Sequence, residues 1–235
     1  MILGTICGRG GSRGVPGKNI RSLRGQPLIY HTIRCARSVS RLSNIAISSD
    51  DSEILDLSKQ FGVTSVFHRP AYLSTDTASK WLVWRDLLTR YEEKHSVWVE
   101  YLVDLDITTP LRRPEHVEAC IDLAIQENCE VVITSYPSER NPYFNMMQLD
   151  SDGAGRVVAQ SPSPIVCRQD APKVLSLSPA VYVVSRRALF QYDFWSQATC
   201  RLVEIEPIFA RDIDSELDFH FIEFLIDQKY VDLAE

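Results

Sequence analysis

Short apolar runs alternate with amphipathic segments along most of the chain. Strand-like apolar runs occupy residues 2–7, 44–49, 63–67, 97–105 and 130–136. Apolar positions spaced by three and four predict helices over residues 27–39, 52–61, 75–93 and 114–127. Pro27 suits the first position of its helix, and Thr75, Asp76 and Thr77 offer caps for the third. This alternation predicts an α/β fold, with a doubly wound, mostly parallel sheet and right-handed crossovers.

The alternation breaks down between residues 137 and 178. That segment is rich in Pro, Ser, Asn and Gly, with short strand-like pieces near Met146 and Val157. Strands resume over residues 180–185 and 201–205, and an amphipathic helix over residues 215–229 closes the chain. We therefore expect a single domain over residues 1–235, with an inserted arm at 137–178.

Composition places the chain among ordinary globular proteins. Apolar residues make up 45% and charged residues 24%, which excludes long disorder. The apolar runs are far shorter than a membrane span, and residues 1–4 lack the pattern of a signal peptide. The six cysteines include no CxxC pair, which argues against a zinc or redox site. We expect a cytoplasmic protein that associates with neither membrane nor nucleic acid.

Charge is distributed unevenly. Eight Lys or Arg residues precede Asp50, which is the first acidic residue, whereas the remaining 186 residues hold 17 basic and 31 acidic groups. A basic N-terminal fifth in an acidic protein favours a local anion site over a nucleic-acid coat. A surface asymmetry without function is the alternative.

The loop after the first strand carries the strongest chemical signal. It holds five glycines between positions 8 and 17, together with Arg9, Arg13 and Lys18. Backbone N–H groups of such a loop can cradle phosphate oxygens. The loop matches neither GxxxxGK[ST] nor GxGxxG, so it predicts a phosphate site of another kind. A plain surface turn is the alternative.

Two pairs of carboxylates are candidates for metal chemistry. Asp212 and Asp214 alternate along an extended segment, so they point the same way and suit a hard cation such as Mg²⁺. Helix capping by Asp214 or Ser215 explains the same residues equally well. Asp104 and Asp106 end an apolar strand, where α/β proteins bind ligands, although Asp-Thr-Thr-Pro is also ordinary turn chemistry.

Three segments stand out together: the loop CGRGGSRGVPGKNI from Cys7, the segment RPAYLSTDTAS from Arg69 and the segment DIDSELD from Asp212. Together they resemble the motifs of the cytidylyltransferases that activate sialic acids and related nine-carbon acidic sugars. Their order and spacing agree with the family over nearly the whole chain. The resemblance implies a Rossmann-like fold of the nucleotide-diphospho-sugar transferase type, with the arm used for dimerisation. It also implies a Mg²⁺-dependent reaction, with Mn²⁺ as the alternative ion, in which CTP and a nonulosonic acid give a CMP-sugar and pyrophosphate.

The resemblance also assigns roles to single residues. The implied catalytic residues are Arg9, Lys18 and Asp214. The implied nucleotide site comprises Gly8, Arg9, Gly10, Gly11, Ser12, Arg13, Lys18, Asn19, Arg69 and Ser79. The implied sugar site comprises Asp106, Thr108, Arg112, Arg168 and Ser178. The implied metal ligands are Asp212 and Asp214, with Asp106 as a further candidate.

Two departures from the family pattern bear on the sugar. Asp106 stands where the sialic-acid enzymes carry a Gln that contacts the sugar, and Ser178-Pro179 replaces Asn-Gly. Three functions therefore stay open. They are a nucleotidyltransferase for a sialic-acid-like or other sugar, a metal-dependent glycosyltransferase that uses Asp104 and Asp106 as a DxD site, and a non-catalytic nucleotide-binding module.

Overall fold

The computed structural model describes residues 1–11 and 14–233 of the chain. Seven strands form one sheet in the order β11-β7-β10-β6-β1-β4-β5. Their bounds are β1 Ile2–Cys7, β4 Asn44–Ser49, β5 Ser65–His68, β6 Tyr101–Asp104, β7 Val131–Pro137, β10 Leu175–Ser185 and β11 Cys200–Glu204. β10 runs antiparallel to both of its neighbours, and every other pairing is parallel. The predicted mostly parallel α/β sheet is confirmed.

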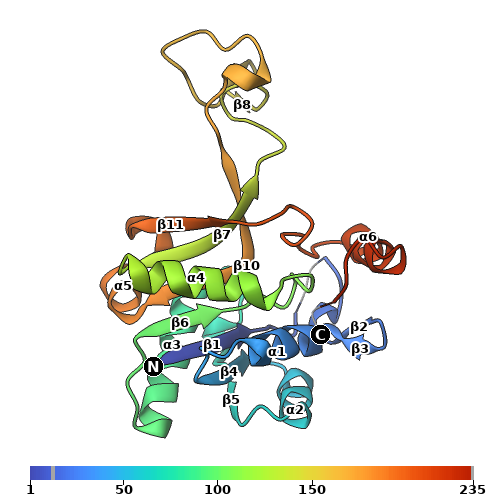
Figure 1. Ribbon diagram of the computed structural model, residues 1–235, viewed down its shortest axis with the longest axis vertical. Coiled ribbons are helices and arrows are strands. Elements are labelled where there is room, and N and C mark those ends of the chain that lie inside the picture. The colour runs from blue at the N-terminus through green and yellow to red at the C-terminus, as the bar shows by residue number, and fades with distance from the viewer. Residues whose placement is uncertain (12–13, 234–235) are drawn as a thin grey trace.

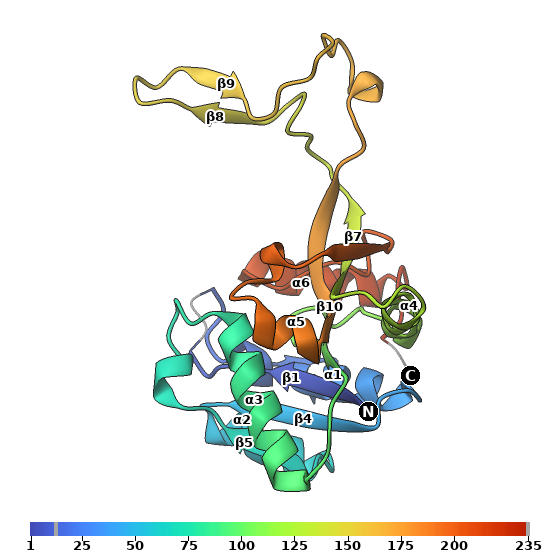
Figure 2. The same ribbon diagram turned by 90° about the vertical axis from the view of Figure 1, so that its left-hand side faces the viewer.

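Helices cover both faces of this sheet (Figures 1 and 2). The helices are α1 Leu28–Ser38, α2 Ser52–Gln60, α3 Lys80–His95, α4 Pro114–Gln126, α5 Arg186–Gln191 and α6 Glu216–Asp227. One apolar core joins the sheet to α1, α2, α4 and α6, and the second joins it to α3 and α5. Successive residues of a strand face opposite sides, so Ile6 enters the first core and Leu3 the second. None of the described helices combines the length and apolar character needed to cross a bilayer.

Several boundaries differ from the sequence-based prediction. The third helix begins at Lys80 rather than at the predicted caps near Thr75, and a 3-10 turn at Ala71–Leu73 precedes it. Pro27 ends a two-stranded ribbon, β2 Ser22–Leu23 with β3 Gln26–Pro27, and caps α1 instead of opening it. β6 spans Tyr101–Asp104 rather than the predicted residues 97–105, and the left-handed Ser96 caps the end of α3 before it.

The segment between β7 and β10 leaves the body of the molecule as an arm (Figures 1 and 2). It carries the hairpin of β8 Met147–Leu149 and β9 Gly155–Val157, and every residue of both strands is exposed. β10 begins at Leu175 rather than at the predicted residue 180, because its first residues pair with the end of β7. The register then shifts between Leu177 and Tyr182, where Ser178 and Pro179 interrupt the pairing.

Candidate active site

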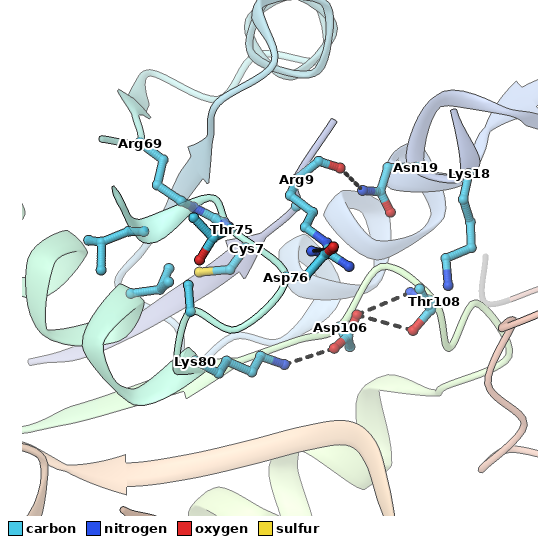
Figure 3. A pocket seen from close by; sticks show the side chains of 14 residues that line it. Cys7, Arg9, Lys18, Asn19, Arg69, Thr75, Asp76, Lys80, Asp106 and Thr108 are labelled. Atoms are coloured by element: carbon cyan, nitrogen blue, oxygen red, sulfur yellow. Dashed lines mark hydrogen bonds and ion pairs between the residues drawn. The ribbon is translucent and has the colours of Figure 1, made fainter. Parts of the chain in front are cut away.

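Four parallel strands, β1, β4, β5 and β6, end at one edge of the sheet, and the predicted phosphate loop follows the first of them. A cavity of about 260 Å³ lies at this edge (Figure 3). Its lining includes Gly8, Arg9, Lys18, Asn19, Arg69, Asp106 and Thr108 from the sequence-based assignment. We call it the nucleotide cavity. Ser79 does not line it, although its neighbours Ala78 and Lys80 do.

Two backbone N–H groups hold the glycine loop in place, and a side chain at Gly8 or Gly10 would crowd neighbouring side chains. The Gly8 N–H donates to Ser48 O at 3.1 Å, and the Gly10 N–H donates to Asp50 Oδ1 at 3.1 Å. A Cβ at Gly8 would lie 2.7 Å from Ile107 Cδ1, and one at Gly10 would lie 2.7 Å from an Asp51 oxygen. A Cβ at Gly11 would meet no atom within 4 Å in the part of the chain that the structure describes. The predicted ligands Ser12 and Arg13 lie outside the described residues.

Three basic side chains assigned to the nucleotide site from the sequence line the nucleotide cavity: Arg9, Lys18 and Arg69. Arg9 forms an ion pair with Asp76, Nη1 to Oδ1 at 2.5 Å, and Asn19 Nδ2 donates to the Arg9 carbonyl at 2.9 Å (Figure 3). Lys18 is buried, donates to the Ile213 carbonyl and lies 3.5 Å from Asp214 Oδ1. Arg69 is 5% exposed and donates through Nε and Nη2 to Ser48.

Lys80 is a functional candidate that the sequence reasoning missed. Its Nζ lies 2.8 Å from Asp106 Oδ2 and 2.9 Å from Asp104 Oδ2, and it lines the cavity. Burial alone would lower the pKa of Lys80, but the two carboxylates outweigh it and hold the pKa well above its ordinary value. Nothing in the sequence around Lys80 separates it from an ordinary helix lysine, because the contact depends on how α3 docks beside β6.

The predicted sugar-binding residues separate into two groups. Asp106 and Thr108 line the cavity, and Thr108 Oγ1 donates to Asp106 Oδ1 at 3.1 Å. Arg112 is only 1% exposed and donates through Nη1 to the carbonyls of Asp106 and Ala180, so it braces the loop from beneath instead of facing a ligand.

The remaining two predicted sugar-binding residues also make backbone contacts. Ser178 is buried, and its hydroxyl donates to the Ala210 carbonyl at 3.3 Å. Arg168 lies in the arm and donates to the carbonyls of Ser138 and Glu139. Both side chains therefore hold backbone segments in place. Ser178 holds the segment before Asp212, and Arg168 holds the base of the arm.

Asp212 and Asp214 face a second cavity of about 430 Å³ at the base of the arm. Its polar lining comprises Tyr136, Ser138, Glu139, Arg140, Ser176, Arg211, Asp212, Asp214 and Asp218. Burial raises the pKa of Asp212 to about 6, and the neighbouring carboxylates of Asp106 and Asp214 raise it further. Asp212 Oδ1 is buried and has no hydrogen-bond partner among the described residues, whereas the Asp214 side chain is 79% exposed.

The Asp212–Asp214 pair fits a divalent cation, and Asp106 does not complete a third ligand. No group of three His, Cys, Asp or Glu residues in the described chain is arranged to hold a metal. Both oxygens of Asp106 already accept hydrogen bonds, from Lys80 and Thr108. Mg²⁺ is commonly held by one or two carboxylates, with substrate phosphates and water as further ligands. The unpartnered Asp212 oxygen is the kind of atom that such an ion would satisfy.

The fold and this edge of the sheet define a nucleotide-binding α/β protein of the nucleotidyltransferase class. The family model described as cytidylyltransferase matches residues 4–230, and the chain belongs to that family. It is 36% identical over 228 residues to the CMP-N,N'-diacetyllegionaminic acid synthase of Campylobacter jejuni, covering 97% of this chain and 96% of that protein. The post-translational flagellin modification protein B of Campylobacter coli gives the same identity and coverage.

A solved structure supports the fold independently of sequence. The CMP:2-keto-3-deoxy-manno-octonic acid synthetase complexed with CTP superposes with a TM-score of 0.72 at 17% identity. The match covers 97% of this chain and 99% of that one. At this identity the likeness shows a shared fold.

Proposed function

We propose that the protein transfers CMP from CTP to an acidic nine-carbon sugar of the nonulosonic type, with release of pyrophosphate. One observation carries the proposal: two cavities flank a single cluster of polar residues. Asp106 and Thr108 line the nucleotide cavity, and Asp212 and Asp214 line the cavity at the base of the arm. Lys18 joins the two, because it lines the first cavity and lies 3.5 Å from Asp214. A donor and an acceptor bound on the two sides would meet at this cluster.

Charge in the nucleotide cavity suits a triphosphate. Arg9, Lys18 and Arg69 line it, and the backbone of the glycine loop borders it. The second cavity holds Arg140 and Arg211, which offer partners for the carboxylate of an acidic sugar. The relatives at 36% identity include one named for N,N'-diacetyllegionaminic acid, which makes that sugar the first to test.

The proposed chemistry is a displacement at the α-phosphorus. The anomeric hydroxyl oxygen of the sugar forms a bond to the α-phosphorus of CTP. The bond between the α-phosphorus and the α,β-bridging oxygen breaks, pyrophosphate leaves with that oxygen, and the hydroxyl proton passes to solvent. Lys18 and Arg9 neutralise charge on the phosphates, and the two cavities fix donor and acceptor in line. Asp212 and Asp214 would hold a Mg²⁺ ion, which when bound stabilises negative charge on the phosphate oxygens. A location in the cytoplasm, where CTP is available, is part of the proposal.

A homodimer formed through the arm belongs to the same proposal. The hairpin of the arm presents Met147 and Leu149, each 69% exposed, and the arm also presents Val166 at 82%. A protruding element with apolar side chains of this kind suits burial against a second copy.

The glycosyltransferase alternative is disfavoured by the state of its DxD pair. Asp104 is fully buried and accepts a hydrogen bond from Thr5 Oγ1, and Lys80 lies against both carboxylates. A cation bridging the two would have to displace Lys80.

Product analysis tests the proposal. The protein is incubated with Mg²⁺ and CTP together with legionaminic, pseudaminic or neuraminic acid derivatives, and products are identified by mass spectrometry. We expect a CMP-sugar with one of them, and its loss in Asp214→Asn and Lys18→Met. The absence of CMP-sugar with all three acids would reject the proposed function.

A further inference from the structure

Lys80 occupies an unusual position for a lysine. It is the first residue of α3, where the helix dipole disfavours a positive charge. Two carboxylates explain its placement, since its Nζ lies within 2.9 Å of both Asp104 and Asp106. Aromatic rings flank it, with the centroid of Tyr182 at 5.0 Å and that of Trp84 at 5.5 Å. The Lys80 ammonium group therefore contacts carboxylates and rings of the protein itself, although the residue also lines the nucleotide cavity.

The contacts of Lys80 continue as a chain toward the second cavity. Asp106 accepts from Lys80 through Oδ2 and from Thr108 Oγ1 through Oδ1 (Figure 3). The Thr108 carbonyl in turn accepts from the Ile213 N–H at 2.9 Å. Ile213 lies between Asp212 and Asp214, so the chain runs from the start of α3 to the proposed cation ligands.

We propose that Lys80 is a positioning residue that neutralises Asp106 and holds its carboxylate on Thr108. In this arrangement Asp106 neither repels the triphosphate nor competes for the cation of Asp212 and Asp214. The inference rests on the proposed nucleotide site. It differs from a direct role, in which the Lys80 ammonium would itself bind phosphate.

The two roles predict different coupling between Lys80 and Asp106. Removing Lys80 alone would leave the buried Asp104 carboxylate without its cation, which is costly and threatens folding. The comparison is therefore made in an Asp104→Asn background, where the 104 side chain is neutral. Four proteins form the cycle: the background itself, the background with Lys80→Met, with Asp106→Asn, and with both.

Calorimetric titration of CTP in EDTA, without metal or sugar, supplies the readout. We expect Lys80→Met to weaken CTP binding about fivefold or more while Asp106 is present, and to have little effect once Asp106 is Asn. If Lys80→Met weakens CTP binding equally with Asp106 present and with Asp106→Asn, Lys80 contacts the nucleotide itself. If it weakens CTP binding in neither case, Lys80 has no role in binding. Both results overturn the proposal.

Two further variants guard against trivial explanations. Lys80→Arg in the otherwise unchanged chain keeps the charge, and we expect CTP affinity within about twofold of the parent. A fivefold or greater loss in Lys80→Arg would contradict charge neutralisation, and this test stands even if a Lys80→Met protein fails to fold. Lys94→Met removes a lysine of the same helix that stacks over Phe67 and does not line the nucleotide cavity, so it should leave CTP binding unchanged.

The outcomes separate this inference from the proposed function. Failure of the parent protein to bind CTP would remove both. CTP binding with additive effects of Lys80 and Asp106 would remove only the role of Lys80. Normal coupling without CMP-sugar formation would remove only the proposed sugar transfer.

Discussion

Gly14 connects the phosphate loop to the proposed cation ligands, and a single methyl group tests that connection. A Cβ at position 14 would lie 1.8 Å from the carbonyl oxygen of Asp214 and 3.0 Å from its carbonyl carbon. The two segments therefore meet backbone to backbone. Since contacts below 3.0 Å are essentially never tolerated, Gly14→Ala must separate them by about 1 Å.

The expected effect on activity is much larger than the effect on folding. The obstructing atom belongs to the backbone, so the strain displaces the loop at Gly14 and the segment at Asp214 relative to each other. Misplacement of catalytic groups by about 1 Å can cost about 100-fold in rate. Overpacking of this kind costs about 1–3 kcal/mol of stability, which lowers Tm by about 2–12 °C for a chain of this size. We expect kcat/KM to fall about 100-fold in a protein that is still folded at 25 °C.

The assay is pyrophosphate release from CTP in the presence of sugar, with Tm measured on the same samples. Gly11→Ala is the matched control for folding, because a methyl group there meets no atom of the described residues within 4 Å and its Tm should not change. A Gly14→Ala protein that keeps more than about a third of kcat/KM would refute the reasoning that the loop positions Asp214 by close packing.

Three other perturbations follow from the geometry. Asp76→Asn frees Arg9 from its exposed ion pair, so CTP affinity measured by calorimetry should rise, but by no more than about fivefold, and weaker binding would contradict this. Because the pKa of Asp212 is raised to about 6, its ionised form is disfavoured in the folded protein, and stability falls as pH rises toward that value. Asp212→Asn should therefore raise the metal-free Tm at neutral pH, and the gain in Tm should shrink toward about pH 4. A gain in Tm that does not depend on pH would contradict the raised pKa of Asp212. Met147→Glu with Leu149→Glu should convert the proposed dimer into a monomer by light scattering without lowering the Tm of the body, and a persistent dimer would locate the interface elsewhere.

The sequence was sufficient for features that depend on neighbouring residues. Alternating apolar runs predicted the sheet, and parallel strands necessarily end at one edge, which brings the loop at Gly8, the turn at Arg69 and the turn at Asp106 to one cavity. The joint role of Asp212 and Asp214 in metal binding stays a prediction, because the Asp212 carboxylate is largely buried and the Asp214 side chain is 79% exposed.

Contacts between distant segments were beyond that reasoning. Lys80 meets Asp104 only because α3 packs on the face of β6 that carries this side chain, and Gly14 meets Asp214 across two hundred positions of the chain. Arg112 was expected to face the sugar, but its guanidinium turns inward to the nearby Asp106 carbonyl and to the Ala180 carbonyl, which β10 brings beside β6. No local pattern distinguishes an arginine that binds a ligand from one that braces a loop.

The most direct test of the proposed reaction is a ³¹P NMR time course with CTP, Mg²⁺ and N,N'-diacetyllegionaminic acid. The account predicts that a phosphodiester resonance of CMP-sugar and a resonance of pyrophosphate grow together in equal amounts, and only when sugar is present. Formation of a nucleoside diphosphate, or of free CMP without the diester, would contradict transfer of CMP to the sugar.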